Sequence, residues 1–284
     1  MKKIALIIFC LIFLVGCTNN NEDNSSKDKI IAELEYCHTR LVDILNNLNN
    51  ISLQNYELIS QKVQISQETE ETEGTSGQSQ EGGNSQSSNQ SSGQSQEITV
   101  TEMQAKSVLS TDTNNIDWEA LRSEIEVVNE YWDILMLDLY NAKVSNDDII
   151  NFANTLDECT LNINAEDKNT ALSNLSILYA YIPKFLNVIS AETSLQNIRN
   201  TQSNTISAYV SANIDDWESV NTHMINAENS FISVLNDIEF SKNREYKVNK
   251  TYMAIKDMQN AVKTQDKSLL FLKYKNLMEN LNTL

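Results

Sequence analysis

The sequence predicts an all-α protein, and two observations carry that prediction. The chain of 284 residues contains one Pro and six Gly, which is too little turn chemistry for a sandwich, a barrel or a doubly wound sheet. Apolar residues recur every three to four positions between residues 30 and 51, and again over most of the chain after residue 115. This spacing is typical of helices that bury one face.

Residues 1–17 have the features of a secretory signal: two lysines, an apolar run and a final Gly16-Cys17. The run is too short for a confident membrane-spanning helix. Leu14-Val15-Gly16-Cys17 resembles the lipobox of bacterial lipoproteins. The resemblance implies that residues 1–16 are a signal peptide removed by cleavage, and that the Cys17 thiol receives a lipid with two acyl chains such as palmitate. The alternative is an uncleaved membrane anchor with an incidental cysteine.

Two acyl chains give stable membrane anchoring, whereas one gives only reversible binding. The expected location is therefore the extracytoplasmic face of the cell membrane, with the lipid anchor as the membrane contact. Residues 17–27 are polar and read as a lipidated tether. Asp28 is a plausible cap for the helix that follows.

Residues 28–65 are predicted to form an N-terminal amphipathic helix, although its pattern weakens after Ile51. Its apolar seam is Ile30, Leu34, Cys37, Leu41, Ile44, Leu48 and Ile51. Residues 66–97 contain no aliphatic or aromatic side chain, so we expect a disordered linker rich in Ser, Gln, Glu and Gly. The helix either docks on the rest of the protein, which makes the linker a surface loop, or forms a separate stalk near the membrane.

After Ile98 the chain is predicted to be helical to its end. Residues 98–212 form a first helical unit with a connecting helix, and residues 213–284 form a second unit. Ser145 opens a capping box for the second helix of the first unit. Pro183 is expected to kink or break the third helix because it removes a backbone donor. The predicted seams of the first two helices are Leu121, Ile125, Val128, Trp132, Leu135 and Leu139, then Ile149, Phe152, Leu156, Cys159 and Ile163.

The sequence repeats weakly at a shift of 99 positions. Asp117-Trp118-Glu119 falls on Asp216-Trp217-Glu218, and Asp167 falls on Asp266. The seam positions also coincide, without gaps, across three helices. We therefore predict an ancestral duplication, which yields two tandem three-helix units joined by a long helix. The alternative is that any two amphipathic bundles can be aligned in this way.

Four short pieces of the helical part carry a second resemblance. They are NIDWE from Asn115, LDLY from Leu137, EDK from Glu166 and YIPK from Tyr181. Through them the chain looks like uncharacterised secreted helical lipoproteins of Gram-positive bacteria. The resemblance implies a fold and a location, and no activity.

The sequence points to neither a metal site nor a cofactor site. Cys37 and Cys159 could form a disulfide in an extracytoplasmic compartment, but both lie on apolar seams and two buried thiols are favoured. His38 and His223 are the only histidines, and neither has a partner at zinc-finger spacing. We expect both to occupy solvated positions.

The Asp-Trp-Glu element is the most distinctive local feature. Trp118 and Trp217 could form docking sites for a partner, or they could close the ends of the helical cores; the second reading is favoured. Paired acids such as Asp147-Asp148 fall at helix starts, where capping explains them. We find no Gly-rich phosphate loop and no nucleophile, base and acid in a catalytic arrangement. The protein is therefore not expected to be an enzyme.

The function expected by elimination is that of a membrane-anchored extracytoplasmic lipoprotein that acts as a non-enzymatic protein-binding or envelope-organising module. The formal charge of −18 disfavours nucleic acid as a partner, because phosphates are bound by Lys and Arg. The alternative is a carrier of a small ligand, a metal or haem that serves a transporter. A hydrolase of wall polymers would need a carboxylate pair that the sequence does not identify.

Overall fold

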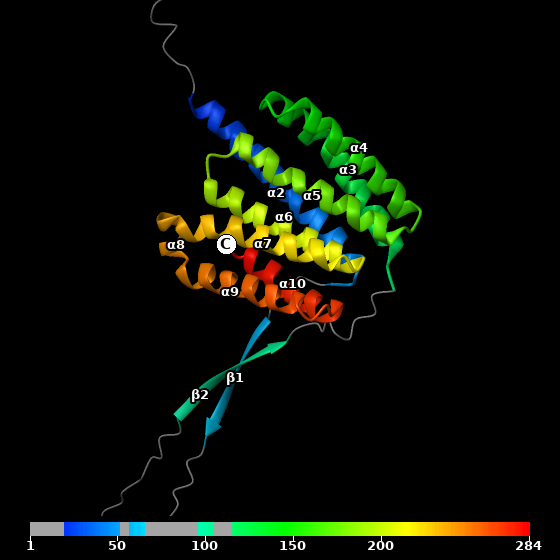
Figure 1. Cartoon of the computed structure of the whole chain (residues 1–284). Helices are drawn as coiled ribbons and strands as arrows, with labels where there is room; N and C mark the ends of the chain where they lie inside the picture. The colour runs from blue at the N-terminus through cyan, green and yellow to red at the C-terminus, as the bar shows by residue number, and fades with distance from the viewer. Residues whose placement is uncertain (1–19, 52–56, 66–95, 105–114) are drawn as a thin grey trace, which may run out of the picture. The chain divides into compact units, whose positions relative to one another are not determined.

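The computed structural model describes residues 20–51, 57–65, 96–104 and 115–284 (Figure 1). The chain divides into two compact units, of which one holds the helices and the other, residues 54–106, holds a small sheet. The helical unit confirms the all-α class. The signal peptide, Cys17 and most of the Ser/Gln-rich linker lie outside the described residues.

The small sheet is a pair of antiparallel strands, β1 (Glu57–Ile65) and β2 (Gln96–Gln104), in which Glu57 lies opposite Gln104. The prediction of helix at both segments was wrong. The helical spacing stops at Ile51, and Ile98-Thr99-Val100-Thr101 alternates apolar with polar residues. Such β-branched alternation favours a strand.

The helical unit contains eight long helices and one short one among its described residues. They are α2 (Asn20–Asn47), α3 (Trp118–Asn141), α4 (Asn146–Asn164), α5 (Lys168–Ile189), α6 (Thr193–Asn213), α7 (Trp217–Asn236), α8 (Ile238–Asn243), α9 (Glu245–Val262) and α10 (Lys267–Leu281). In the first half α2 and α4 each contact both α3 and α5, and in the second half α6 and α9 each contact both α7 and α10. The helices thus form two four-helix groups, joined where α5 packs on α6 (Figure 1).

The apolar seams predicted for α3 and α4 are buried as expected. All eleven seam side chains are at most 5% exposed, and they belong to one continuous core that extends through both four-helix groups. Ser145 caps α4 by accepting a bond from the Asp148 N–H at 3.5 Å. The bond that the predicted capping box assigns to Ser145 is therefore confirmed.

The 99-residue register recurs in the caps of the helices. Side chains of Asp117, Asp167, Asp216 and Asp266 accept bonds from the backbone N–H groups of Ala120, Thr170, Ser219 and Leu269. Two pairs of helix starts, those of α3 with α7 and of α5 with α10, are thereby capped in the same way at that shift. The caps support the proposed duplication, whose ancestral origin stays a prediction.

The connecting helix predicted at the end of the first unit is instead α6, the first helix of the second four-helix group. Its counterpart in the first group is α2, because α2 precedes α3 and contacts α3 and α5, as α6 precedes α7 and contacts α7 and α10; both helices also end in the same type of turn. Asn50 and Asp215 have left-handed φ angles of 52° and 63°, and the next N–H bonds back to Asn46 O at 2.9 Å and to Ser211 O at 3.0 Å. These are Schellman motifs. Each group therefore has four principal helices where three were predicted, and the N-terminal helix docks.

Two local expectations differ from the structure. Helix α2 begins at Asn20, so Asp28 lies within it and does not cap it. The helix can include the polar residues 20–27 because none of them is Pro or Gly. Pro183 lies inside α5, which continues to Ile189. It is buried, as are Ile182 and Phe185 close to it in α5, and this packing offsets the loss of one backbone bond.

The segment between α2 and α3 is expected to be dispensable for the helical unit. In the second group Asp215 joins α6 directly to the cap of α7, whereas the first group carries more than sixty additional residues at that point. The two ends already meet, because the Asn50 side chain donates to Asn115 O at 2.8 Å. Deleting residues 52–115 should keep the helicity and leave the melting temperature equal or higher, since a shorter loop costs less closure entropy. Calorimetry would show a clear decrease if the segment supports the fold.

Candidate functional site

The two tryptophans favoured as core-closing residues are the first residues of α3 and α7. Trp118 and Trp217 are half-buried and pack against the core. Their position supports core closure over partner docking.

Cys37 and Cys159 are free, buried thiols, as favoured from their place on the seams. Burial raises the pKa of each to about 12. Only the thiolate is nucleophilic or binds a metal tightly, so these thiols are inert at neutral pH. Both serve as small apolar side chains of the first four-helix group.

The expectation that His38 is solvated was wrong, because its side chain is 5% exposed. Its ring meets the Tyr179 ring edge-on at a centroid distance of 5.2 Å, and Nδ1 has no hydrogen-bond partner among the described residues. Burial, with a smaller contribution from the charge of Arg199, lowers the pKa of His38 well below its usual value. His38 is therefore neutral. His223 is only half-buried on α7.

The most connected polar group joins α2 to α6. Arg199 on α6 donates from Nε to Glu35 Oε1 at 2.9 Å, and its Nη2 donates to Glu35 Oε2. Nη1 donates to Gln202 Oε1 at 2.5 Å, which also accepts from the Tyr179 hydroxyl at 2.9 Å. Gln202 Nε2 donates in turn to Asn282 Oδ1 at 2.8 Å. We call these five residues the Arg199 network.

A pocket of about 290 Å³ lies beside the Arg199 network, between α2, α6 and the end of α10. It is lined by Glu35, His38, Thr39, Val42, Asp43, Arg199 and Asn282. Its one cation is already paired with Glu35, and no group of three or more metal-ligating side chains occurs among the residues that the structure describes. The polar groups therefore act mainly on one another, and they fix how α2 seats on the second four-helix group.

Two tyrosine–asparagine pairs extend this polar contact to the C-terminal end of α2 and the turn that follows it. The Tyr274 hydroxyl donates to Asn46 Oδ1 at 2.8 Å, and Asn49 Nδ2 donates to the Tyr209 hydroxyl. The two tyrosine rings stack at 4.3 Å. Burial raises the pKa of both hydroxyls, so they remain neutral hydrogen-bonding groups. Sequence reasoning missed these residues because polar side chains leave no apolar periodicity.

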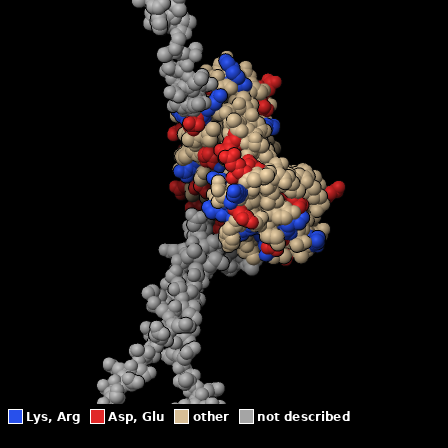
Figure 2. Space-filling model, turned by 90° about the vertical axis from the view of Figure 1, so that its left-hand side faces the viewer, with Lys and Arg blue, Asp and Glu red and all other residues tan. Residues whose placement is uncertain are grey.

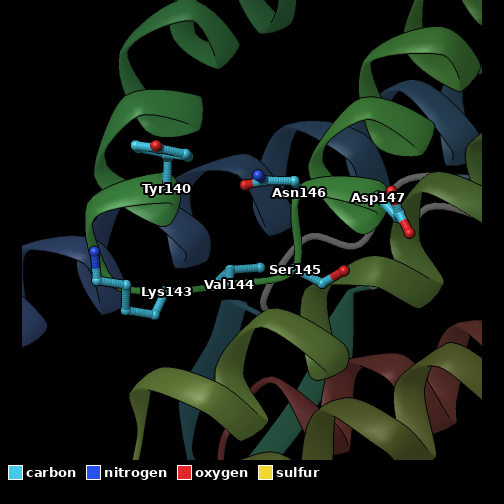
Figure 3. Close-up of a pocket in the computed structure, with 6 residues that line it drawn as sticks. All are labelled: Tyr140, Lys143, Val144, Ser145, Asn146 and Asp147. Carbon is cyan, nitrogen blue, oxygen red and sulfur yellow. The ribbon is translucent and has the colours of Figure 1, made fainter.

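A second pocket, of about 410 Å³, surrounds the connection between α3 and α4. Tyr140, Lys143, Val144, Ser145, Asn146 and Asp147 line it. Figure 3 shows these side chains distributed along the connection, with Tyr140 on the α3 side and Asp147 on the α4 side. They do not point toward a common position. This pocket is therefore a surface hollow at a helix turn, without a convergent set of ligands.

The outer face of α3 carries an exposed apolar stripe formed by Val127, Ile134 and Leu137. These side chains are 39%, 56% and 59% exposed, although they occur on a helix whose core face is complete. Their spacing of seven and three residues places them on one side of the helix. We call Val127, Ile134 and Leu137 the α3 stripe.

The fold does not require apolar residues in the α3 stripe. At the 99-residue register its three positions correspond to Asn226, Ser233 and Asn236 of α7, all exposed. The same helix position in the second four-helix group is thus polar. Comparison of the two repeats by sequence could have found the stripe, because it consists of apolar residues that lie off the core seam.

An acidic row of three side chains accompanies the α3 stripe, with one acid inside the stripe and two along one side of it. Glu130 is three residues after Val127 and four before Ile134, while Glu126 and Asp133 lie on the adjoining side of the helix. All three acids are exposed, and none forms an ion pair within the described part of the chain. On the face drawn in Figure 2, acidic and basic side chains are intermixed.

Comparison with known proteins finds no match to a protein-family model, to a curated protein or to a solved structure. Within the described segments, no helix is both long enough and apolar enough to cross a membrane. The residues themselves therefore carry the functional argument.

Proposed function

We propose that the protein is a lipid-anchored binding module on the extracytoplasmic face of the cell membrane, where it binds a protein partner and performs no catalysis. Diacylated Cys17 is the anchor in this proposal. The support for the location is the lipobox-like sequence that ends at Cys17. The support for partner binding is the α3 stripe.

The α3 stripe is the single observation that carries the binding proposal. Isolated exposed apolar side chains are common on soluble proteins, but an aligned set bordered by charges is typical of an interaction surface. Here the corresponding positions of α7 are polar, so the stripe is not explained by the needs of the fold. A partner that covers Ile134 and Leu137 would remove their apolar surface from water, which favours association.

Site-specific photocrosslinking in native membranes tests this proposal. A photoreactive amino acid at Leu137 on α3 should yield a defined adduct with one protein, in a near-stoichiometric amount. The matched control carries the same group at Leu161 of α4, which is 67% exposed and should give no such adduct. Absence of any protein adduct at Leu137 would contradict the binding function. A Cys17→Ser variant should leave the membrane fraction; its retention there would contradict the anchor.

A further inference from the structure

We infer that the partner of the α3 stripe presents a basic amphipathic helix, a step that rests on the proposed protein-binding function. The stripe and its acidic row together have the pattern that such a helix complements. Apolar side chains of the partner would cover Val127, Ile134 and Leu137. Lys or Arg side chains on one flank would face Glu126 and Asp133, and a basic side chain within the contacting face would meet Glu130.

The length of the stripe fits a short helical segment. Val127 and Leu137 are ten positions apart on α3, which corresponds to about 15 Å along the helix axis. About three turns of a partner helix span that distance. Anchors three, four and seven residues apart are the usual way in which an amphipathic helix contacts a hydrophobic surface.

The acidic side chains of α3 determine which charge the partner helix should carry. The acids that accompany the stripe have no cationic neighbour paired with them in the described part of the chain, whereas Asp138, toward α2, is already paired with Lys29 at 2.7 Å. An acidic helix would place like charges against Glu126, Glu130 and Asp133, and such contacts disfavour association. A neutral apolar helix would leave these carboxylates beside its backbone without a counter-charge. A helix with one basic flank satisfies both the apolar and the acidic positions.

The test uses the full acylated protein in nanodiscs of zwitterionic lipid, with empty nanodiscs as the blank. The probe is a fluorescent helical peptide of about 18 residues, with leucines three and four positions apart and lysines on one flank. Two control peptides carry Glu in place of Lys, or Gln in place of Leu. Fluorescence anisotropy at low and at physiological salt gives each dissociation constant.

The decisive protein variants change the stripe and its row separately. Ile134→Gln with Leu137→Gln removes the apolar anchors without altering charge, and should weaken binding of the basic peptide at least about tenfold. Glu126→Gln, Glu130→Gln and Asp133→Asn together should weaken it about tenfold at low salt and less at high salt. The matched control, Ile225→Gln with Ile232→Gln, changes two exposed isoleucines on α7 and should alter affinity by less than about twofold.

Three results would overturn the inference: the basic peptide fails to bind, the acidic peptide binds equally well, or the α7 control loses as much affinity as the stripe variant. Circular dichroism should show unchanged helicity for every variant, since all substituted residues are exposed. Photocrosslinking at Leu137 separates this failure from that of the proposed function. A native adduct without binding of the basic peptide refutes only the inferred partner chemistry, whereas loss of both results refutes the protein-binding function as well.

Discussion

Replacing Trp132 by Ala is expected to lower the free energy of unfolding by about 3 to 5 kcal/mol, the usual cost of deleting a large buried aromatic side chain. Trp132 is 5% exposed on the inner face of α3. Its ring stacks on Phe152 of α4 at a centroid distance of 4.0 Å, and Phe185 of α5 lies at 6.3 Å. The substitution therefore leaves a cavity at the contact of three helices. Urea denaturation followed by circular dichroism measures the loss.

Trp132→Phe is the matched control for this cavity. The Trp132 Nε1 has no hydrogen-bond partner among the described residues, so losing this donor removes no bond. The corresponding position in the second four-helix group is Phe231, which is fully buried. We expect a loss of less than about 1.5 kcal/mol, because a smaller aromatic ring retains most of the packing. A negligible effect of Trp132→Ala would contradict the assigned register of α3.

The positions of α3 and α4 were predicted well from the sequence because each of these helices buries only one face. A helix with one buried face places its apolar residues three and four apart, so the seam identifies both the helix and its inner side. Leu121, Leu135 and Ile163 are examples of residues placed correctly in this way. The cap at Ser145 was equally local, since it depends on one side chain and a nearby N–H.

The predicted seam of α2, from Ile30 to Ile51, is buried throughout. The other buried positions of α2, and most of those of α6, were missed because neighbours cover more than one face of these helices. Thr201, Gln202 and Thr205 of α6 are fully buried although they are polar. Thr201 and Thr205 donate to backbone carbonyls four residues earlier, while Gln202 is held by the Arg199 network. Such partners are distant in sequence or local to the backbone, so hydrophobic periodicity gives no sign of them. The prediction that His38 is solvated was wrong for the same reason.

The α3 stripe could have been predicted from the sequence, whereas the Arg199 network could not. Val127, Ile134 and Leu137 stand off the predicted seam, and their counterparts in the repeat are polar. Apolar residues at positions that a sister unit leaves polar are not required by the fold, and here three of them are aligned on one helix face together with unpaired acids. In contrast, nothing in the spacing of Glu35 and Arg199 places them together, since they meet only when the two four-helix groups pack.

Replacing Arg199 by Ala is expected to lower the free energy of unfolding by about 3 kcal/mol. The substitution leaves Glu35 without its bidentate partner and removes one donor from Gln202. Breaking a buried ion pair from one side costs about 3 to 5 kcal/mol; we expect the lower end because the Glu35 side chain remains 30% exposed. Arg199→Lys should restore only part of the stability, since an ammonium group cannot reproduce the planar bidentate contact.

Arg122→Ala provides the matched control, because it also removes an arginine that pairs with a glutamate. Arg122 meets Glu166 at 2.6 Å, but the two side chains are 36% and 53% exposed. Exposed pairs contribute less than about 1 kcal/mol, so this variant should unfold almost as the parent protein does. Equal losses for Arg199→Ala and Arg122→Ala would contradict the assigned role of the Arg199 network. A selective loss would show that the Arg199 network helps to fix α2 to the second four-helix group, a contribution that hydrophobic patterning does not reveal.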